Sequence, residues 1–228
     1  PYSKLSNGSE KTVNALTVPD LRAFVRDRFT RDRLIVGVVG DITEQELKTR
    51  LDAVFGDLPA TGPKFEIPEV KPVSSGKTLI VRKQIPQSVV ILGHGGIKRD
   101  DPDWYKALLV TRVFGGGGLS SRLYEEIREK RGLAYSVYAY LSPMQHSGII
   151  AGGVATQNAR AAESVSVIRA EWKKLAENGI TAKELATAKT YLNGSFPLRL
   201  GSSRGIAGML VGIQIADLGM DYIEKRLS

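Results

Sequence analysis

The stretch from residue 114 to residue 137 reads FGGGGLSSRLYEEIREKRGLAYSV, and it sets the path of the chain around it. Its four consecutive glycines end the helix that precedes them, because glycine loses more backbone freedom in a helix than any other residue. A second helix is predicted at about 120–131, and the step Arg131-Gly132-Leu133 breaks it before a strand begins at Ala134. The stretch therefore predicts helix, tight turn, helix and strand in quick succession.

Strand pairs followed by helix pairs surround this stretch. Residues 77–83 and 87–94 are rich in β-branched and apolar side chains, and the short connection between them predicts a hairpin. Two more strands are predicted at 134–141 and 147–156. Helices are predicted at about 101–114, 158–177, 182–195 and 203–218. This order indicates an α+β fold, with helices packed on one face of a largely antiparallel sheet.

The N-terminal part of the chain predicts a helix–strand–helix unit. Thr17, three residues before Asp20, predicts a capped helix at about 18–30. The run Leu34–Val39 is continuous, apolar and β-branched, which is typical of a buried strand. Thr43 with Glu46 then predicts the capped start of a second helix.

A Pro-rich segment separates this part from the rest. Proline removes a backbone donor and disfavours regular structure. We therefore expect residues 1–60 to belong to one domain, 61–76 to form a linker, and 77–228 to form a second domain that is truncated at its end. Because the chain starts without an initiator methionine and stops within a helical pattern, we expect it to be a fragment or a processed piece.

Composition excludes several classes of protein. With 42% hydrophobic and 25% charged residues, the 228-residue chain has the composition of a folded protein. Its longest apolar runs fall far short of the roughly 20 residues that a membrane-spanning helix needs. The 32 basic residues are interleaved with the 24 acidic ones, which is typical of solvated helix faces rather than of a nucleic-acid site.

Metal-ligand residues are scarce in this sequence. The absence of cysteine excludes thiolate nucleophiles and cysteine-based metal sites. His94 and His146 are the only histidines, and they lie too far apart to form a local zinc motif. We expect His94 to be structural and His146 to be exposed in a turn. The glycine run is not a phosphate loop either, because no Lys-Ser/Thr step follows it.

Arg128 and Tyr135 form the pair with the clearest chemical potential. Arg128 ends a predicted helix and Tyr135 starts a predicted strand, so that both side chains can converge on one spot. A guanidinium and a neutral phenol are both hydrogen-bond donors, as a peptide carbonyl that becomes an oxyanion requires. A structural alternative stays open, in which Arg128 pairs with Glu125 and Tyr135 is a surface residue of the strand.

The stretch from Phe114 to Val137 closely resembles the signature of the C-terminal half of pitrilysin/insulinase-type zinc metallopeptidases, which include the mitochondrial processing peptidases. The segments TVPDLRAF from Thr17, LIVGVVGD from Leu34 and FGDLP from Phe55 resemble the end of that family's first domain. Residues from Lys77 onward resemble most of the second domain. The resemblance therefore covers nearly the whole chain.

This resemblance implies two homologous α+β domains that close around an extended peptide. The first domain would supply an H-x-x-E-H zinc motif, and the second an arginine and a tyrosine, here Arg128 and Tyr135, that bind the substrate backbone near the scissile bond. It also implies substrate contacts from the glycine turn and the residues after it, namely Gly116, Gly117, Ser121 and Arg122. Because the zinc motif is absent here, we expect no cofactor in this chain and zinc in the complete enzyme or its partner.

Two functions follow from the resemblance. In the first, this chain is the non-zinc half of a metallopeptidase, inactive alone, which binds peptide substrate and works with a zinc-bearing homologous domain or subunit. In the second, it is an inactive structural homologue, similar to the core subunits of the respiratory cytochrome bc1 complex. A bacterial periplasm is favoured over a mitochondrial matrix as the compartment. Nucleic-acid binding is the weakest expectation, because no aromatic-basic stacking motif supports it.

Overall fold

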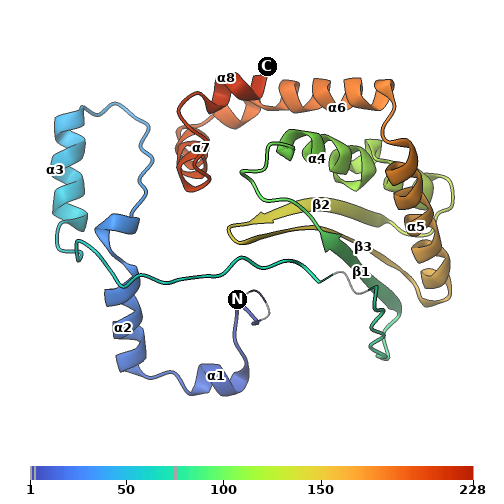
Figure 1. Ribbon diagram of the computed structural model, residues 1–228, viewed down its shortest axis with the longest axis horizontal. Helices are drawn as coiled ribbons and strands as arrows, with labels where there is room; N and C mark the ends of the chain where they lie inside the picture. Colours follow the sequence, from blue (N-terminus) through green and yellow to red (C-terminus); the bar gives the residue numbers. More distant parts are fainter. Residues whose placement is uncertain (1, 3, 74–75, 228) are drawn as a thin grey trace. The chain divides into compact units, whose positions relative to one another are not determined.

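The computed structural model describes residues 2, 4–73 and 76–227 (Figure 1). The chain folds into two compact units. Unit 1 comprises Pro1–Pro68 together with Pro197–Ser228, and unit 2 comprises Glu69–Phe196. The predicted division into residues 1–60, 61–76 and 77–228 stays a prediction.

Unit 1 is helical in its described residues. The helices are α1 (Glu10–Asn14), α2 (Val18–Arg28), α3 (Glu44–Phe55), α7 (Ser203–Ile215) and α8 (Tyr222–Leu227), with short 3-10 turns η1 (Arg31–Arg33) and η6 (Pro197–Leu200). Both predicted capping boxes are confirmed: Thr17 with Asp20 begins α2, and Thr43 with Glu46 begins α3. In each box the threonine hydroxyl accepts from a backbone N–H while the carboxylate accepts from the threonine, which satisfies donors that the helix leaves unpaired.

The predicted strand at Leu34–Val39 is wrong. This segment belongs to no sheet, because no described strand pairs with it. An added Cβ at Gly37 would lie 2.7 Å from the carbonyl oxygen of Ala207, so the segment packs closely against α7 instead. An apolar run carries the tendency to form a strand, but only a neighbouring strand can satisfy its N–H and C=O groups.

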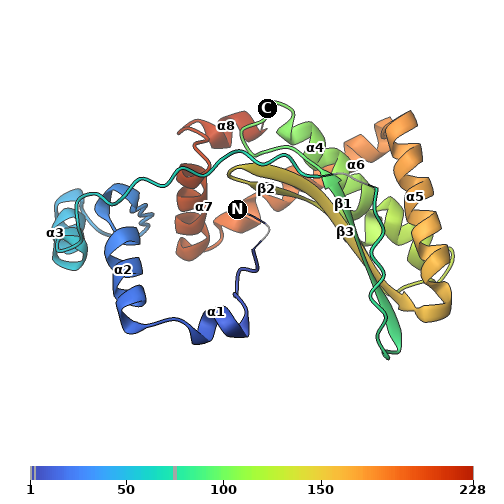
Figure 2. The same cartoon turned by 60° about the horizontal axis from the view of Figure 1, so that its bottom comes forward.

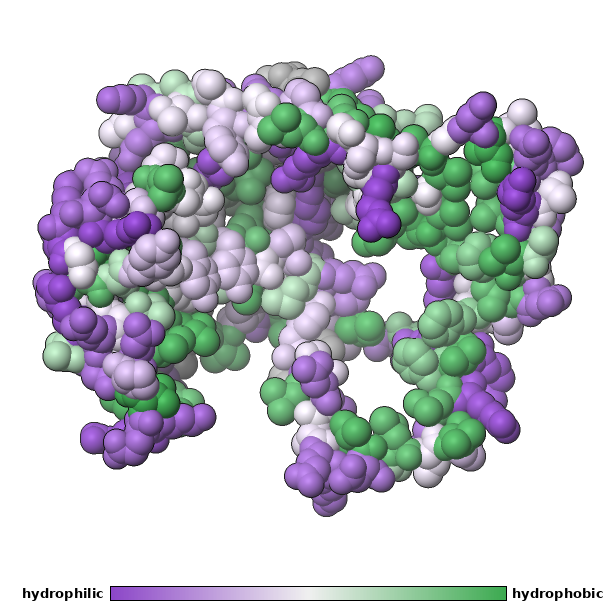
Figure 3. All heavy atoms as spheres, turned by 180° about the vertical axis from the view of Figure 1, so that it is seen from behind, coloured by the Kyte–Doolittle hydropathy of each residue, from purple (hydrophilic) through white to green (hydrophobic). Residues whose placement is uncertain are grey.

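No hydrophobic side chain is buried among the described residues of unit 1. The apolar stripe of α2 illustrates this, since Leu21 is 55% exposed and Phe24 is 58% exposed. Figure 3 shows such hydrophobic side chains as green spheres at the surface of the N-terminal helices, on the right of the view. The hydrophobic core of the described chain therefore lies in unit 2.

Unit 2 contains a three-stranded antiparallel sheet in the order β1-β3-β2. The strands are β1 (Gln87–Gly95), β2 (Ser136–Met144) and β3 (Ser147–Gln157), and the helices are α4 (Trp104–Thr111), α5 (Ala161–Asn178) and α6 (Ala182–Ser195). Helices α4 and α5 lie on the same side of the sheet (Figure 2). This arrangement confirms the predicted α+β fold with helices on one face of an antiparallel sheet.

The strand register separates a covered face from an open face. Val154 of β3 pairs with Val90 of β1 and Val137 of β2, and this row faces the helices, where Val154 is only 2% exposed. The next row pairs Gly153 with Ile91 and Tyr138. Because successive side chains alternate between faces, this second row lies on the open face, where Ile91 is 79% exposed.

The core forms where the helices meet the covered face of the sheet. Its buried members are Phe114, Leu123, Ile127, Leu133, Ala134, Val137, Ala139, Val154 and Ile168. Trp172 of α5 packs against this core with its ring edge on Phe114, 4.8 Å between centroids. Phe114 to Ala139 come from the stretch around the glycine turn, so this stretch supplies most of the core of unit 2.

The predicted strand at 77–83 is also wrong, and with it the predicted hairpin. The carbonyl of Ile85, which precedes β1, accepts a hydrogen bond from the Asn158 side chain at 2.9 Å. Ser88 of β1 donates to the same Asn158 side chain at 2.9 Å. The Asn158 side chain, which follows β3, thus forms hydrogen bonds with polar groups near the predicted hairpin turn.

Limited proteolysis should cut the chain first between Ala60 and Gly76. The described residues of this segment belong to no helix or strand, and most are exposed, so a protease can accommodate their backbone. Sites of cleavage can be read by mass spectrometry of the first fragments. Early cleavage within 101–131, with the Pro-rich segment intact, would contradict the expected linker.

Shortening Ile127 to alanine should destabilise unit 2 by about 2–5 kcal/mol, because it removes a side chain that is 0% exposed and leaves a cavity. Ile91→Ala is the matched control, since Ile91 is 79% exposed. Urea denaturation of both variants measures the difference. Equal losses of stability would show that the core does not lie where the helices meet the sheet.

Candidate functional site

Arg128 lies in a short π-helical segment that sits directly on the core. This segment, η4, spans Tyr124–Glu129 and follows the 3-10 turn η3 (Gly118–Ser120). Leu123 and Ile127, which are 1% and 0% exposed, fix the inner side of the segment. π-Helical segments are rare and occur frequently at functional sites.

Two aromatic rings flank the Arg128 guanidinium. Its central carbon lies 4.3 Å from the centroid of the Tyr135 ring and 4.9 Å from that of the Tyr124 ring. Tyr135 immediately precedes β2, and it is 80% exposed. The structure therefore brings Arg128 and Tyr135 together, as the helix–break–strand pattern predicts.

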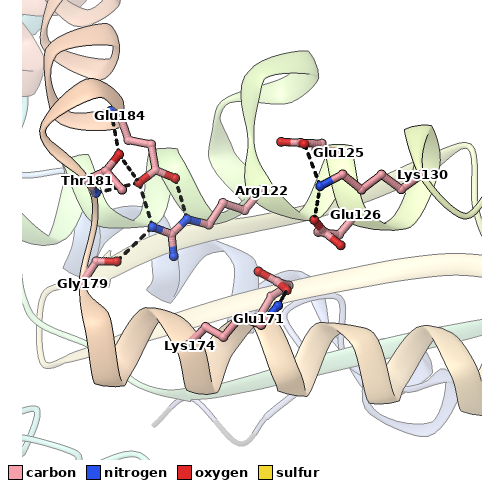
Figure 4. Close-up of polar contacts among 9 residues, drawn as sticks. All are labelled: Arg122, Glu125, Glu126, Lys130, Glu171, Lys174, Gly179, Thr181 and Glu184. Carbon is pink, nitrogen blue, oxygen red and sulfur yellow. Dashed lines mark hydrogen bonds and ion pairs between the residues drawn. The ribbon is translucent and has the colours of Figure 1, made fainter.

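The alternative pair of Arg128 with Glu125 does not form. Glu125 instead forms an ion pair with Lys130 at 2.8 Å, and Arg128 reaches Glu129 only at 3.7 Å. Lys130 also contacts Glu126 at 2.6 Å, so that it bridges two carboxylates (Figure 4). These two hydrogen-bonded carboxylates, Glu125 foremost, raise the pKa of Lys130 well above its usual range. Glu125 and Glu126 are thus paired with Lys130, and the one carboxylate of η4 that forms an ion pair with Arg128 is Glu129.

The glycine turn packs tightly against β2. The π-helical segment η2 (Arg112–Gly116) precedes it, and a Cβ added at Gly115 would lie 2.6 Å from the backbone nitrogen of Ala139. Gly116 is exposed, whereas Gly117 is half-buried and leaves only 2.8 Å between an added Cβ and the Arg112 carbonyl. Glycine is therefore required here by close backbone approach.

Ser121 and Arg122 make internal contacts in this structure. Ser121 is 1% exposed, and its hydroxyl donates to the Gly118 carbonyl at 2.9 Å. Arg122 donates through Nε and Nη2 to the two oxygens of Glu184, at 2.6 Å and 2.7 Å, and through Nη2 to the Gly179 carbonyl at 2.9 Å (Figure 4). Roles of Gly116, Gly117, Ser121 and Arg122 in substrate binding stay predictions.

Glu184 is the partner that the sequence did not single out. It lies in α6, far along the chain from Arg122, and no local spacing links the two. Its one local signal is the Thr181–Glu184 capping box at the start of α6. Tyr124, in contrast, could have been found from its spacing of four residues before Arg128.

The histidines take structural positions. The His94 ring makes an edge contact with Trp172, 4.8 Å between centroids, and His146 approaches Glu69 at 3.3 Å. The second contact differs from the expected exposed position, because the His146 side chain is only 21% exposed. In the part of the chain that the structure describes, no group of three or more His, Cys, Asp or Glu residues could hold a metal ion. These residues therefore do not fit a zinc site.

The model of the family described as Peptidase M16 inactive domain matches residues 15–192. The chain therefore belongs to this family, and the resemblance to pitrilysin/insulinase-type zinc metallopeptidases is confirmed.

Bacterial proteins named as zinc proteases are among the relatives of this chain. The chain is 34% identical over 200 residues to an uncharacterized zinc protease of Streptomyces coelicolor, covering 85% of this chain and 43% of that protein. It is 30% identical over 200 residues to the non-peptidase homolog YmxG of Helicobacter pylori, covering 87% of this chain and 46% of that protein. The chain spans less than half the length of these relatives.

Solved structures show the same fold. A crystal structure of a peptidase M16 inactive domain from Pseudomonas fluorescens superposes with a TM-score of 0.90 at 29% identity, covering 100% of this chain and 54% of that chain. A chain of complex III2 from Candida albicans superposes with a TM-score of 0.73 at 14% identity, covering 99% of this chain and 55% of that chain. The second likeness concerns the fold alone. Among the described residues, no helix is long and apolar enough to cross a membrane.

The ion pair between Arg122 and Glu184 should make the free energy of unfolding depend on pH. Its hydrogen bonds, foremost those from Arg122, lower the pKa of Glu184 from 4.5 to about 2. Below 4.5 the unfolded chain binds this proton before the folded chain does, so the stabilisation is complete above that pH and is lost as the pH falls toward 2.

Urea denaturation of the wild type and Glu184→Gln over this pH range measures the effect. We expect the wild type to be more stable at neutral pH, and the difference to shrink steadily as the solution becomes acidic. If the difference in stability between the two proteins is the same at all pH values, the charge of the Glu184 carboxylate does not contribute to this contact.

Proposed function

We propose that this chain is the non-zinc half of a metallopeptidase, which binds an extended peptide and supplies Arg128 and Tyr135 to the cleavage carried out with a zinc-bearing domain or subunit. Family membership supports the general class. The pairing with a zinc-bearing homologue and the binding of peptide belong to the proposal.

The convergence of Arg128 and Tyr135 is the observation that carries it. The Arg128 guanidinium lies near the rings of Tyr124 and Tyr135, and its ion-pair partner Glu129 stands 3.7 Å away. The Tyr135 side chain is exposed, so its hydroxyl can be reached from solvent. Two donors beside an accessible position suit a peptide carbonyl that develops negative charge.

The open face of the sheet supports the binding of an extended peptide. Val89 and Ile91 of β1 are 67% and 79% exposed, and Tyr138 and Tyr140 of β2 lie on the same face, 47% and 49% exposed. The two tyrosine rings are stacked, 6.1 Å between centroids. Large apolar side chains gathered on one face commonly mark a binding surface. Apolar side chains of a bound peptide can therefore pack here.

A second candidate is a structural subunit without proteolysis. The name of the Helicobacter pylori relative describes a non-peptidase homologue. The fold is also similar to that of a chain of complex III2. The two candidates differ in one consequence. Only the peptidase half requires the hydroxyl of Tyr135.

Tyr135→Phe should lower turnover by about 10²- to 10³-fold, because it removes one donor to the developing oxyanion and keeps the ring over Arg128. Binding should change less than turnover, since the lost hydrogen bond strengthens in the transition state. The assay is cleavage of a quenched peptide by the complete enzyme, meaning the full-length protein or this chain with its zinc-bearing partner.

Tyr191→Phe is the matched control. Tyr191 is 53% exposed on α6, and its ring, not its hydroxyl, faces the Arg112 guanidinium. This control should leave turnover unchanged. Wild-type turnover in a correctly folded Tyr135→Phe assembly would refute the peptidase proposal and favour the structural subunit.

A further inference from the structure

The segment that carries Arg128 is tied to α6 by a bidentate ion pair. Arg122 stands two residues before η4, and its planar fork meets both oxygens of Glu184 at 2.6 Å and 2.7 Å. The two side chains are 18% and 27% exposed, so solvent competes little with the contact. Arginine is the side chain that can make such a pair in a fixed geometry, because its guanidinium is rigid and planar.

The acceptor of this pair is itself held in place. The Thr181 backbone nitrogen donates to Glu184 Oε2 at 2.7 Å, and the Thr181 hydroxyl donates to the same oxygen at 2.9 Å. The Glu184 backbone nitrogen donates in turn to the Thr181 hydroxyl at 3.2 Å. Glu184 is thus fixed to the first turn of α6, and Arg122 is anchored to a rigid element rather than to a mobile side chain.

A second contact ties the other side of the glycine turn to the same helix. The central carbon of the Arg112 guanidinium lies 3.4 Å from the centroid of the Tyr191 ring. Tyr191 follows Glu184 by two helical turns, so both side chains lie on one side of α6. Arg112 and Arg122 stand on either side of Gly115–Gly118. The residues on both sides of the glycine turn thus contact one helix, α6.

From Arg122 the chain leads directly into the candidate pair. Leu123 and Ile127 seat the segment on the core, and Tyr124 and Arg128 follow each of them by one position. A shift of the segment along its axis would move Arg128 away from the Tyr135 ring. Apolar packing is not directional, so the burial of two apolar side chains does not define one position of the segment along its axis. A bidentate hydrogen bond is directional and does define such a position.

We propose that the Arg122–Glu184 bridge is a positioning device, which sets the place of the π-helical segment η4 so that the Arg128 guanidinium stays against the Tyr135 ring. In this role Arg122 acts through the backbone that it holds. The geometric part of this proposal is independent of catalysis. Its consequence for turnover rests on the proposed function.

Glu184→Gln is the sharpest variant. Glutamine can still close the capping box of α6, so the helix start is kept, while the charged bidentate pair with Arg122 is lost. Arg122→Lys is the second variant, because an ammonium keeps the charge but cannot form the fork. Ile168→Val is the matched control, since it weakens the same core at a residue that is 1% exposed without touching the bridge.

The first measurement is the side-chain NMR signal of Arg128 in the complete assembly, with this chain labelled with ¹⁵N-arginine. The signal is assigned by its absence in Arg128→Lys. A guanidinium between two aromatic rings has ring-current-shifted protons, so we expect the shift to collapse in Glu184→Gln and Arg122→Lys and to persist in Ile168→Val. An unchanged Arg128 signal in either bridge variant, once folded, would overturn the proposal.

The second measurement is the kinetic split in the peptide-cleavage assay. Loss of positioning should lower kcat by up to about 100-fold, as small misplacements of a catalytic group do, with little change in KM. Ile168→Val should not lower kcat. If Tyr135→Phe impairs turnover but both bridge variants keep the wild-type kcat, the positioning proposal fails while the proposed function stands. If Tyr135→Phe has no effect, the proposed function fails and the NMR signal alone decides the positioning.

Discussion

Burial of Leu123 and Ile127 against the sheet is the constraint on which the candidate site depends. The two residues are four positions apart, so they share one side of their helical segment, and both are almost fully excluded from solvent. Tyr124 and Arg128 follow them by one position each and therefore share the neighbouring side. The free energy that fixes the apolar pair also aims the guanidinium toward Tyr135. The position of the Arg128 guanidinium on this surface thus depends on packing in the core.

Ion pairs of unequal strength refine this arrangement. The pair of Lys173 with Glu177 is highly exposed, 3.7 Å long, and of the kind that contributes about 0–1 kcal/mol. The pair of Arg122 with Glu184 is short, bidentate and largely shielded, and the lowered pKa of Glu184 reflects that contact. Only the second pair joins elements that are distant in the sequence. It is therefore the charged contact in unit 2 with a clear influence on the geometry around Arg128.

Elements whose signals are local could be predicted from the sequence. The capping boxes at Thr17 and Thr43, the strands around 87–94, 134–141 and 147–156, and the helices of unit 2 all follow from short-range patterns. The runs 34–39 and 77–83 carry similar patterns but form no strand, because a strand also needs a partner for its backbone. The π-helical character of η2 and η4 was not predicted either. Both segments contact β2, and nothing in the residue spacing reports that packing.

The sequence by itself determined the fold class and the family. Its helix, glycine break and strand made a convergence of Arg128 and Tyr135 possible, but a pairing of Arg128 with Glu125 stayed open. Tertiary structure alone joined Arg122 to Glu184 and placed the Arg112 guanidinium over the Tyr191 ring, two contacts between residues that lie far apart in the sequence. The physical reason is distance along the chain: contacts within one turn follow from backbone geometry, whereas the contact of Arg122, just before η4, with Glu184 of α6 exists only after the core has brought these segments together.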